Sequence, residues 1–322
     1  MNNRPTLQDV YETRKRIAPY VVRTPLHRHR ALESILGAEV YVKHENHQVL
    51  GAFKVRGAVN VVSRLSDEDK SRGVISSSTG NFGQGIAYAA GIFGVEVHVV
   101  VPTDVNPGKA ESMRLLGADL ILHGDEFDEA RQHAERLALE QGYRYIHSAN
   151  EPMLTAGTGT YTLEIMEDLP DVDVIIVPVG GGSGACGACI VSKSINPDVC
   201  VIGVQAEAAP AAYQSWKAGH VEEAPMKTVA EGLATGTGYE FTQAILRDLL
   251  DDFILVSETE LKAAMVLNLE KTHNLTEHAG SAALAAAIKI KDQLRGKKVA
   301  LVISGGNASL DQLRAALDQV PG

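Results

Sequence analysis

The chain has 322 residues, with 30 lysines and arginines against 40 aspartates and glutamates, so its formal net charge is −10. This acidic balance argues against nucleic acid or an anionic membrane as the main partner. The length is ample for a sizeable core and predicts two lobes, or one large domain with an inserted one. No apolar run approaches a membrane span, and the N-terminus lacks the apolar core of a signal peptide, so we predict a cytoplasmic protein.

Strands and helices alternate along the chain. The hydrophobic patterns predict helices over residues 8–17, 57–65, 86–93, 107–116, 127–141 and 185–192. They predict strands over residues 40–44, 73–76, 95–101, 119–122, 174–179, 200–204, 253–256 and 299–303. Such alternation is typical of a parallel, doubly wound α/β architecture. Because residues 74–122 alone repeat the strand–helix–strand pattern, we predict a small α/β domain over residues 71–149, inserted into a large domain of residues 1–70 and 150–322.

The first segment that could carry chemistry is Leu50-Gly-Ala-Phe-Lys-Val-Arg-Gly57. Here Lys54 lies beside Phe53, small residues and glycines, which suit a partly apolar pocket. Desolvation and a neighbouring cation such as Arg56 would favour the neutral amine, the form that attacks carbonyl groups. The alternative is a solvated lysine at the start of a helix, since most lysines are exposed.

Two further loops follow predicted strands. Ser76-Ser-Ser-Thr-Gly-Asn-Phe-Gly-Gln-Gly85 supplies hydroxyl groups, backbone donors and an amide at a helix N-terminus, which together suit a carboxylate. Near the C-terminus, Leu301-Val-Ile-Ser-Gly-Gly-Asn307 places Ser304 at the end of a strand. The alternatives are a plain helix cap and a plain turn. Ligands of open α/β sheets bind at the carboxyl ends of strands, so these loops are expected to converge on one crevice.

The most glycine-rich loop is Val179-Gly-Gly-Gly-Ser-Gly-Ala-Cys-Gly187, between a predicted strand and a predicted helix. Bare backbone N–H groups and the positive end of a helix dipole predict a phosphate site there. The segment 182–187 also fits the GxGxxG pattern, and Glu207 lies where a ribose-binding carboxylate would be expected. An NAD-dependent oxidoreductase therefore stays open as an alternative.

Cysteine and histidine show no metal or redox pattern in the sequence. Cys186 and Cys189 form a CxxC inside the predicted helix, with no second pair and no histidines at zinc spacing. They are therefore interpreted as small buried thiols, and Cys200 likewise. The eleven histidines are scattered along the sequence, and none forms an HExxH motif.

Taken together and in their order along the chain, the motifs resemble the pyridoxal-phosphate enzymes of the tryptophan-synthase β fold. Within that fold, the chain is most similar to the serine/threonine dehydratase and serine racemase group. Further matches are Arg23-Thr-Pro-Leu26, Ala156-Gly-Thr-Gly159 with Glu164, and Glu277-His-Ala-Gly280. The resemblance implies two doubly wound, mostly parallel sheet domains with the active site in the cleft between them, and a homodimer.

The resemblance also assigns roles to residues. Lys54 would hold pyridoxal 5′-phosphate through its ε-amine and act as the base at the substrate Cα, with Phe53 beside the cofactor ring. Asn81 would bind the ring 3-oxygen, and Ser304 would face the ring nitrogen. The cofactor phosphate would be bound by Gly180, Gly181, Gly182, Ser183 and Gly184. The substrate carboxylate would be bound by Ser78, Thr79, Gly80 and Asn81.

The implied activity is a β-elimination that converts a threonine- or serine-like β-hydroxy-α-amino acid to a 2-oxo acid and ammonia. A neutral Ser304 beside the ring nitrogen would favour loss of the β-leaving group over transamination. Racemases of the group have a serine where this chain has Thr79, which keeps a hydroxyl group, so an amino-acid racemase is the near alternative.

The chain departs from the group's pattern at several positions. Metal-dependent members carry acidic residues where this chain has Gln205, Ala209 and Ala211, so no metal site is expected, although Glu207 leaves a divalent cation open. Phe82 and His278 replace the usual residues and are expected to reshape the pocket toward a larger or unusual substrate.

Overall fold

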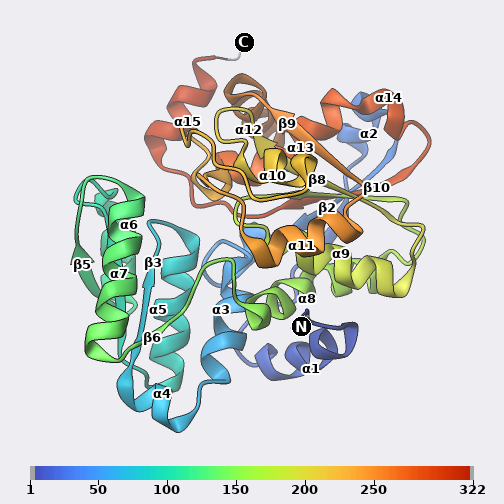
Figure 1. The fold of residues 1–322 in the computed structure, drawn as a ribbon. Coiled ribbons are helices and arrows are strands. Elements are labelled where there is room, and N and C mark those ends of the chain that lie inside the picture. The colour runs from blue at the N-terminus through green and yellow to red at the C-terminus, as the bar shows by residue number, and fades with distance from the viewer. Residues whose placement is uncertain (1–3, 320–322) are drawn as a thin grey trace.

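The larger of two sheets has six strands in the order β1-β2-β10-β7-β8-β9 (Figure 1). The structure, a computed structural model, describes residues 4–319. The strands are β1 (Leu26–Arg28), β2 (Glu39–His44), β7 (Val174–Pro178), β8 (Cys200–Ala206), β9 (Asp252–Val256) and β10 (Lys298–Ile303). Only the pairing of β1 with β2 is antiparallel in this sheet. The predicted parallel α/β architecture is confirmed.

The smaller sheet has four parallel strands in the order β5-β4-β3-β6. These are β3 (Val74–Ser77), β4 (Val97–Val101), β5 (Asp119–Leu122) and β6 (Arg144–Tyr145). With their helices they form a separate lobe, on the left in Figure 1. All four strands fall inside the predicted insertion 71–149, whose exact limits remain a prediction.

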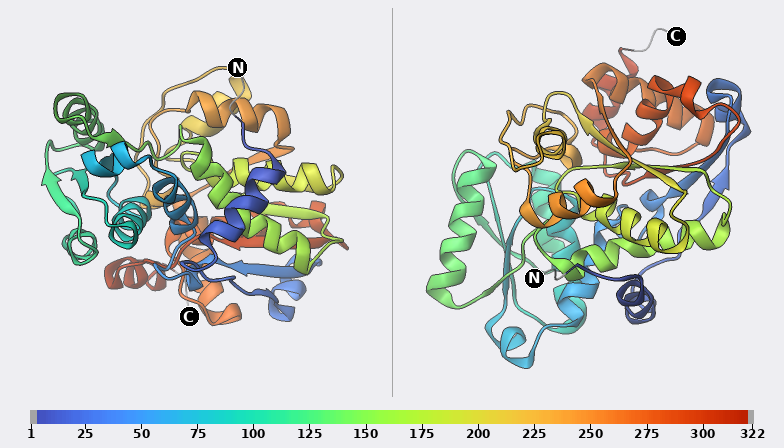
Figure 2. Two further views of the ribbon diagram at one scale, coloured as in Figure 1. Left: turned by 90° about the horizontal axis from the view of Figure 1, so that it is seen from below. Right: turned by 45° about the vertical axis from the view of Figure 1, so that its right-hand side comes forward.

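Helices cover both faces of the larger sheet (Figure 2), which is why its strands are apolar runs rather than alternating patterns. Val174 and Ile176 of β7 pack into a core under α13 (His278–Lys289), while Ile175 and Val177 pack against α9 (Ser183–Ile195). Successive residues of one strand point to opposite faces, so both sets are buried.

The other helices are α1 (Leu7–Ile17), α2 (Arg30–Leu36), α3 (Lys54–Ser63), α4 (Asp67–Arg72), α5 (Asn81–Phe93), α6 (Pro107–Leu115), α7 (Phe127–Gln141), α8 (Pro152–Asp168), α10 (Ala211–Ala218), α11 (Glu240–Leu249), α12 (Glu258–Thr272), α14 (Lys291–Leu294) and α15 (Leu310–Leu317). Between residues 4 and 319, no helix combines the length and the apolar character needed to cross a bilayer.

The predicted start of the third helix at Gly57 is wrong, because α3 begins at Lys54. Gly57 lies inside the helix, where a Cβ atom would approach the Leu154 carbonyl oxygen to 2.8 Å. A glycine at position 57 therefore allows the close contact between α3 and α8. It does not mark an end of the helix. This shift puts Lys54 at the N-terminus of α3.

Candidate active site

The three strand-ending loops converge on one cleft. The turn after β3 leads into α5, the turn after β7 leads into α9, and Ser304 follows β10 directly. A cleft of about 310 Å³ lies where these loops meet. Every predicted site residue lines it: Phe53, Lys54, Ser78, Thr79, Gly80, Asn81, Gly180, Gly181, Gly182, Ser183, Gly184 and Ser304. The convergence follows from the parallel sheets, whose carboxyl ends lie at one edge.

Lys54 points into the loop at the start of α9. Its Nζ donates a hydrogen bond of 3.1 Å to Oγ of Ser183. The same nitrogen lies 5.3 Å from the ring centroid of Phe53 and 5.9 Å from that of Phe82. Desolvation in these surroundings lowers the Lys54 pKa to about 8, so a neutral amine is accessible near neutral pH.

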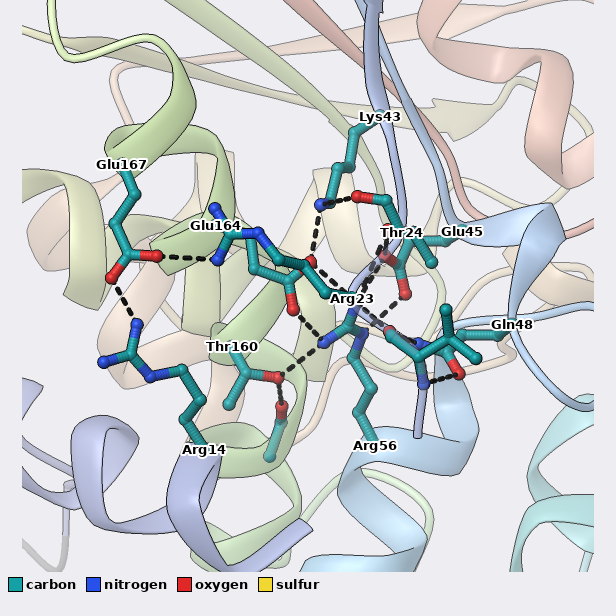
Figure 3. A network of polar contacts seen from close by, with 12 residues as sticks. Arg14, Arg23, Thr24, Lys43, Glu45, Gln48, Arg56, Thr160, Glu164 and Glu167 are labelled. Atoms are coloured by element: carbon teal, nitrogen blue, oxygen red, sulfur yellow. Dashed lines mark hydrogen bonds and ion pairs between the residues drawn. The ribbon is translucent and has the colours of Figure 1, made fainter. Parts of the chain in front are cut away.

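The predicted contribution of Arg56 to this pKa is wrong, because desolvation is the cause that acts on Lys54. The Arg56 guanidinium is buried and faces away from the cleft, into an ionic cluster (Figure 3). It donates to Oε2 of Glu45 and to Oε1 of Glu164, both at 2.7 Å. Lys43 donates to the other oxygen of Glu164 at 2.5 Å. Two cations thus balance two carboxylates, and Arg56 anchors α3 to the turn that follows β2 and to α8.

The glycine loop before α9 has the shape of an anion cradle. Gly182 has φ +96° and caps the helix, a backbone conformation that favours glycine. A Cβ atom on Gly180 would lie 2.3 Å from the Gly232 carbonyl oxygen, and one on Gly181 would lie 2.9 Å from Cβ of Ala149. Side chains are excluded at the loop, and the first N–H groups of α9 remain to bind a phosphate.

Asn81 is held by two neighbours. Its Nδ2 donates to Oε1 of Glu277 at 2.8 Å, and its Oδ1 accepts from Nδ2 of Asn307 at 2.7 Å. These two contacts fix the orientation of the Asn81 side-chain amide. The amide can therefore donate from Nδ2, and a hydrogen-bond donor is what an anionic oxygen on a cofactor ring requires. Burial raises the Glu277 pKa to about 7. In the sequence, Glu277 belongs to the segment Glu277-His-Ala-Gly280, which predicts no role for its carboxylate.

An ion pair between Lys109 of α6 and Glu231 lies in the lining of the cleft. Both side chains line the cleft, and they join the lobe of the smaller sheet to the larger one. Neither was singled out from the sequence, because a lone lysine and a lone glutamate carry no motif. Tertiary contact alone identifies them.

The structure bears on four further residues or groups of residues that the sequence singled out: Phe82, His278, the cysteines and Glu207. Phe82 lines the cleft. His278 is buried at the start of α13 and lines a small neighbouring cavity, which shares Glu277 with the cleft, so its effect on the pocket stays a prediction. Cys186 and Cys189 are buried, as predicted, whereas Cys200 is only half-buried. The Glu207 carboxylate accepts from Nζ of Lys289 at 3.2 Å, so it is neutralised by a lysine.

The geometry of the cleft fits pyridoxal phosphate: an amine of lowered pKa, a phosphate cradle beside it, and an oriented amide donor. Comparison with known proteins agrees. Residues 17–305 match the family described as pyridoxal-phosphate dependent enzyme. An L-threonine ammonia-lyase of Thermotoga maritima is 41% identical over 96% of this chain and 77% of that protein. An L-threo-3-hydroxyaspartate ammonia-lyase of Saccharomyces cerevisiae is 37% identical over 95% of this chain and 94% of that protein.

Among solved structures, maize serine racemase superposes with a TM-score of 0.91 at 32% identity, covering 98% of this chain and 97% of that one. The chain therefore belongs to the family of pyridoxal-phosphate dependent enzymes. Within that family it is a lyase of the serine/threonine dehydratase and serine racemase group, and pyridoxal phosphate is its cofactor. The NAD-dependent alternative is wrong, since the chain belongs to a family of pyridoxal-phosphate dependent enzymes.

Proposed function

We propose that this enzyme is an ammonia-lyase acting on a β-hydroxy-α-amino acid such as threonine or serine. The substrate loses its α-hydrogen and β-hydroxyl group as water, and one water then replaces the nitrogen, leaving a 2-oxo acid and ammonia. The observation that carries the proposal is the hydrogen bond between Nζ of Lys54 and Oγ of Ser183, which places an amine of lowered pKa beside a phosphate cradle.

Lys54 is assigned two tasks. As a neutral amine it would hold the cofactor at its carbonyl group, and as a free amine it would remove the proton from the substrate Cα. Bound pyridoxal phosphate supplies an electron sink for the bond that is broken at Cα. The lowered pKa serves both tasks, because a base works best when its pKa is near the operating pH.

The substrate carboxylate is assigned to the N-terminus of α5. This 13-residue helix begins at Asn81, after a loop that adds the hydroxyl groups of Ser78 and Thr79. Backbone N–H groups and the helix dipole favour a carboxylate there. Such placement would orient the Cα–H bond toward Lys54 on the other side of the cleft.

Asn81 and Ser304 are assigned to the two polar positions of the cofactor ring. Glu277 and Asn307 orient the Asn81 amide, so its donor is available to the 3-oxygen. Ser304 follows β10 and has a neutral side chain, and its carbonyl oxygen accepts from the Phe53 N–H at 3.1 Å. A neutral partner at the ring nitrogen would favour departure of the β-hydroxyl group over transamination.

The proposal is tested on the purified holoenzyme with single enantiomers of threonine, serine and 3-hydroxyaspartate. We expect 2-oxo acid and ammonia in equal amounts, and loss of activity in Lys54→Ala. Lys70→Ala, at a partly exposed lysine of α4, is the matched control and should keep full activity. Full turnover by Lys54→Ala would overturn the assigned mechanism.

A racemase is the second candidate, because the Thr79 hydroxyl group lines the same cleft and serine racemases share this fold. Measuring the opposite enantiomer beside 2-oxo acid separates the two activities. Enantiomer interconversion faster than 2-oxo acid release would reverse our assignment. The homodimer, the cytoplasmic location and the domain limits at 71–149 remain predictions that size measurement, fractionation and limited proteolysis can test.

A further inference from the structure

Histidines that are far apart in the sequence gather at the edge of the larger sheet. His27 and His29 flank the end of β1, and His44 ends β2. Residues two apart in a strand share a face, and the pairing of His27 with Val42 puts His44 on that same face. The antiparallel pairing of β1 with β2 therefore brings the three imidazoles to one place.

The spacing of their nitrogen atoms suits a metal ion. One ring nitrogen from each of His27, His29 and His44 lies within 4.8 Å of the others. The two Nε2 atoms of His29 and His44 are 3.1 Å apart. Two histidine nitrogens bound to one tetrahedral zinc ion, at about 2.0–2.1 Å each, are separated by about 3.3 Å. His29 and His44 therefore need only a small adjustment, and His27 would close on them to complete the site.

His44 is the buried member of the cluster. Its side chain is fully buried, and among the described residues its Nδ1 has no hydrogen-bond partner. A buried ring nitrogen of this kind calls for a water molecule or an ion as its partner.

The cluster is open on one side and supported on the other. His27 is exposed, which leaves room for a water molecule as a fourth ligand. His47 stacks on His44, with ring centroids 5.0 Å apart, and its Nε2 lies 2.6 Å from Oδ1 of Asn274. A rigid support of this kind fixes ring orientation, as outer contacts of metal ligands do.

We propose that His27, His29 and His44 form a binding site for one divalent transition-metal ion such as zinc. The site has three nitrogen ligands and no carboxylate, so it selects against Mg²⁺ and Ca²⁺, which prefer oxygen. The histidine site is separate from the cation site considered near Glu207. Glu207 lies elsewhere in the fold and forms an ion pair with Lys289.

Metal binding would staple β1 to β2 and stabilise the native chain. β1 is an edge strand of three residues, and within residues 4–319 it pairs with β2 alone. His44 is also in register with Ile303, the residue before Ser304. A metal ion at this site would therefore hold the strand that neighbours the cofactor-binding strand, and binding only to the native state raises Tm with ligand concentration.

The test uses the holoenzyme, stripped of metal by a chelator and titrated with ZnCl₂ by calorimetry and thermal melting. We expect one zinc per chain and a Tm that rises with zinc concentration, while MgCl₂ has no effect. His29→Ala and His27→Ala, at less buried positions than His44, should each weaken zinc binding by at least about tenfold, since loss of even an outer contact costs 10–100-fold.

The matched control is the double substitution of His123 and His133 to Ala. These rings also stack, with centroids 3.8 Å apart, but they belong to the lobe of the smaller sheet. This variant should bind zinc with the same affinity as the wild type. X-ray absorption spectroscopy of zinc bound to the wild type should show nitrogen and oxygen ligands without sulfur. Zinc binding that His29→Ala leaves unchanged, or that the His123/His133 variant abolishes, would overturn the proposal. Absence of zinc binding would do the same and would leave His29 and His44 as a hydrogen-bonded pair.

Discussion

Asn81 and Glu277 are joined across the cleft by a hydrogen bond of 2.8 Å, from Nδ2 of the amide to Oε1 of the carboxylate. The bond ties the first residue of α5 to the residue that caps α13. Because burial raises the Glu277 pKa to about 7, the charge of this contact changes near neutral pH. The contact makes both the position of Asn81 and the stability of the chain depend on pH.

Glu277→Gln tests this dependence. Glu277 has an ordinary pKa of 4.5 and a native pKa of about 7, so the native state binds the extra proton between these values. Its stabilising contribution is present below pH 4.5 and is lost as the pH rises through 7. Relative to the variant, the cofactor-free wild type should lose on the order of 2–3 kcal/mol of unfolding free energy from pH 4.5 to 8. Urea unfolding at several pH values measures the difference, and parallel curves would contradict the assignment.

Cofactor uptake should depend on the protonation of Lys54. The neutral amine is the form that bonds to a carbonyl group, and its fraction rises as the pH passes through about 8. The rate at which cofactor-free enzyme gains covalently bound cofactor should therefore rise from pH 6.5 and level off above 8. Borohydride reduction followed by mass measurement reports it. Lys54→Arg should show no adduct, and an adduct on another lysine would refute the role of Lys54.

Gly180→Ala should abolish tight cofactor binding. A methyl group there meets the Gly232 carbonyl oxygen at 2.3 Å, so the loop must move away from the phosphate position. Gly91→Ala is the control, since the nearest atom to its Cβ would be 3.6 Å away, in the exposed part of α5. That change should stabilise the helix by roughly 0.5–1 kcal/mol and leave cofactor affinity unchanged. Equal affinities for the two variants, measured by absorbance titration, would remove the basis for a packed phosphate loop.

Arg56→Met should destabilise the fold strongly. The change leaves Glu45 and Glu164 buried with only Lys43 to balance them, and breaking a buried ionic cluster costs about 3–5 kcal/mol. Arg23→Ala is the control, because Arg23 makes its ion pairs with 48% of its side chain exposed, and exposed pairs contribute about 0–1 kcal/mol. Denaturant unfolding of both variants gives the comparison, and similar losses would show that the cluster adds little stability.

Much of the fold and the cleft could be predicted from local pattern. The apolar runs of β4 and β7 and the glycines after β7 identify buried strands and a phosphate loop without knowledge of their neighbours. The predicted site residues do line one cleft, because parallel strands bring their carboxyl ends to one edge. Helices such as α8 and α12 were not predicted. α8 is buried over most of its surface, so no polar stripe marks its period.

Local patterns in the sequence predict the class of fold and the loops that meet, because periodicity and glycine placement are local properties of the chain. The resemblance to a known family then singles out Lys54 as the amine that holds the cofactor. Tertiary structure alone decided how that amine is tuned. Arg56, two residues from Lys54, is turned toward Glu45 and Glu164, and desolvation sets the Lys54 pKa instead. The tertiary structure also brings Asn81 to Glu277, and His27 and His29 to His44. These contacts join positions distant in sequence, and no local pattern encodes which distant side chain fills a pocket.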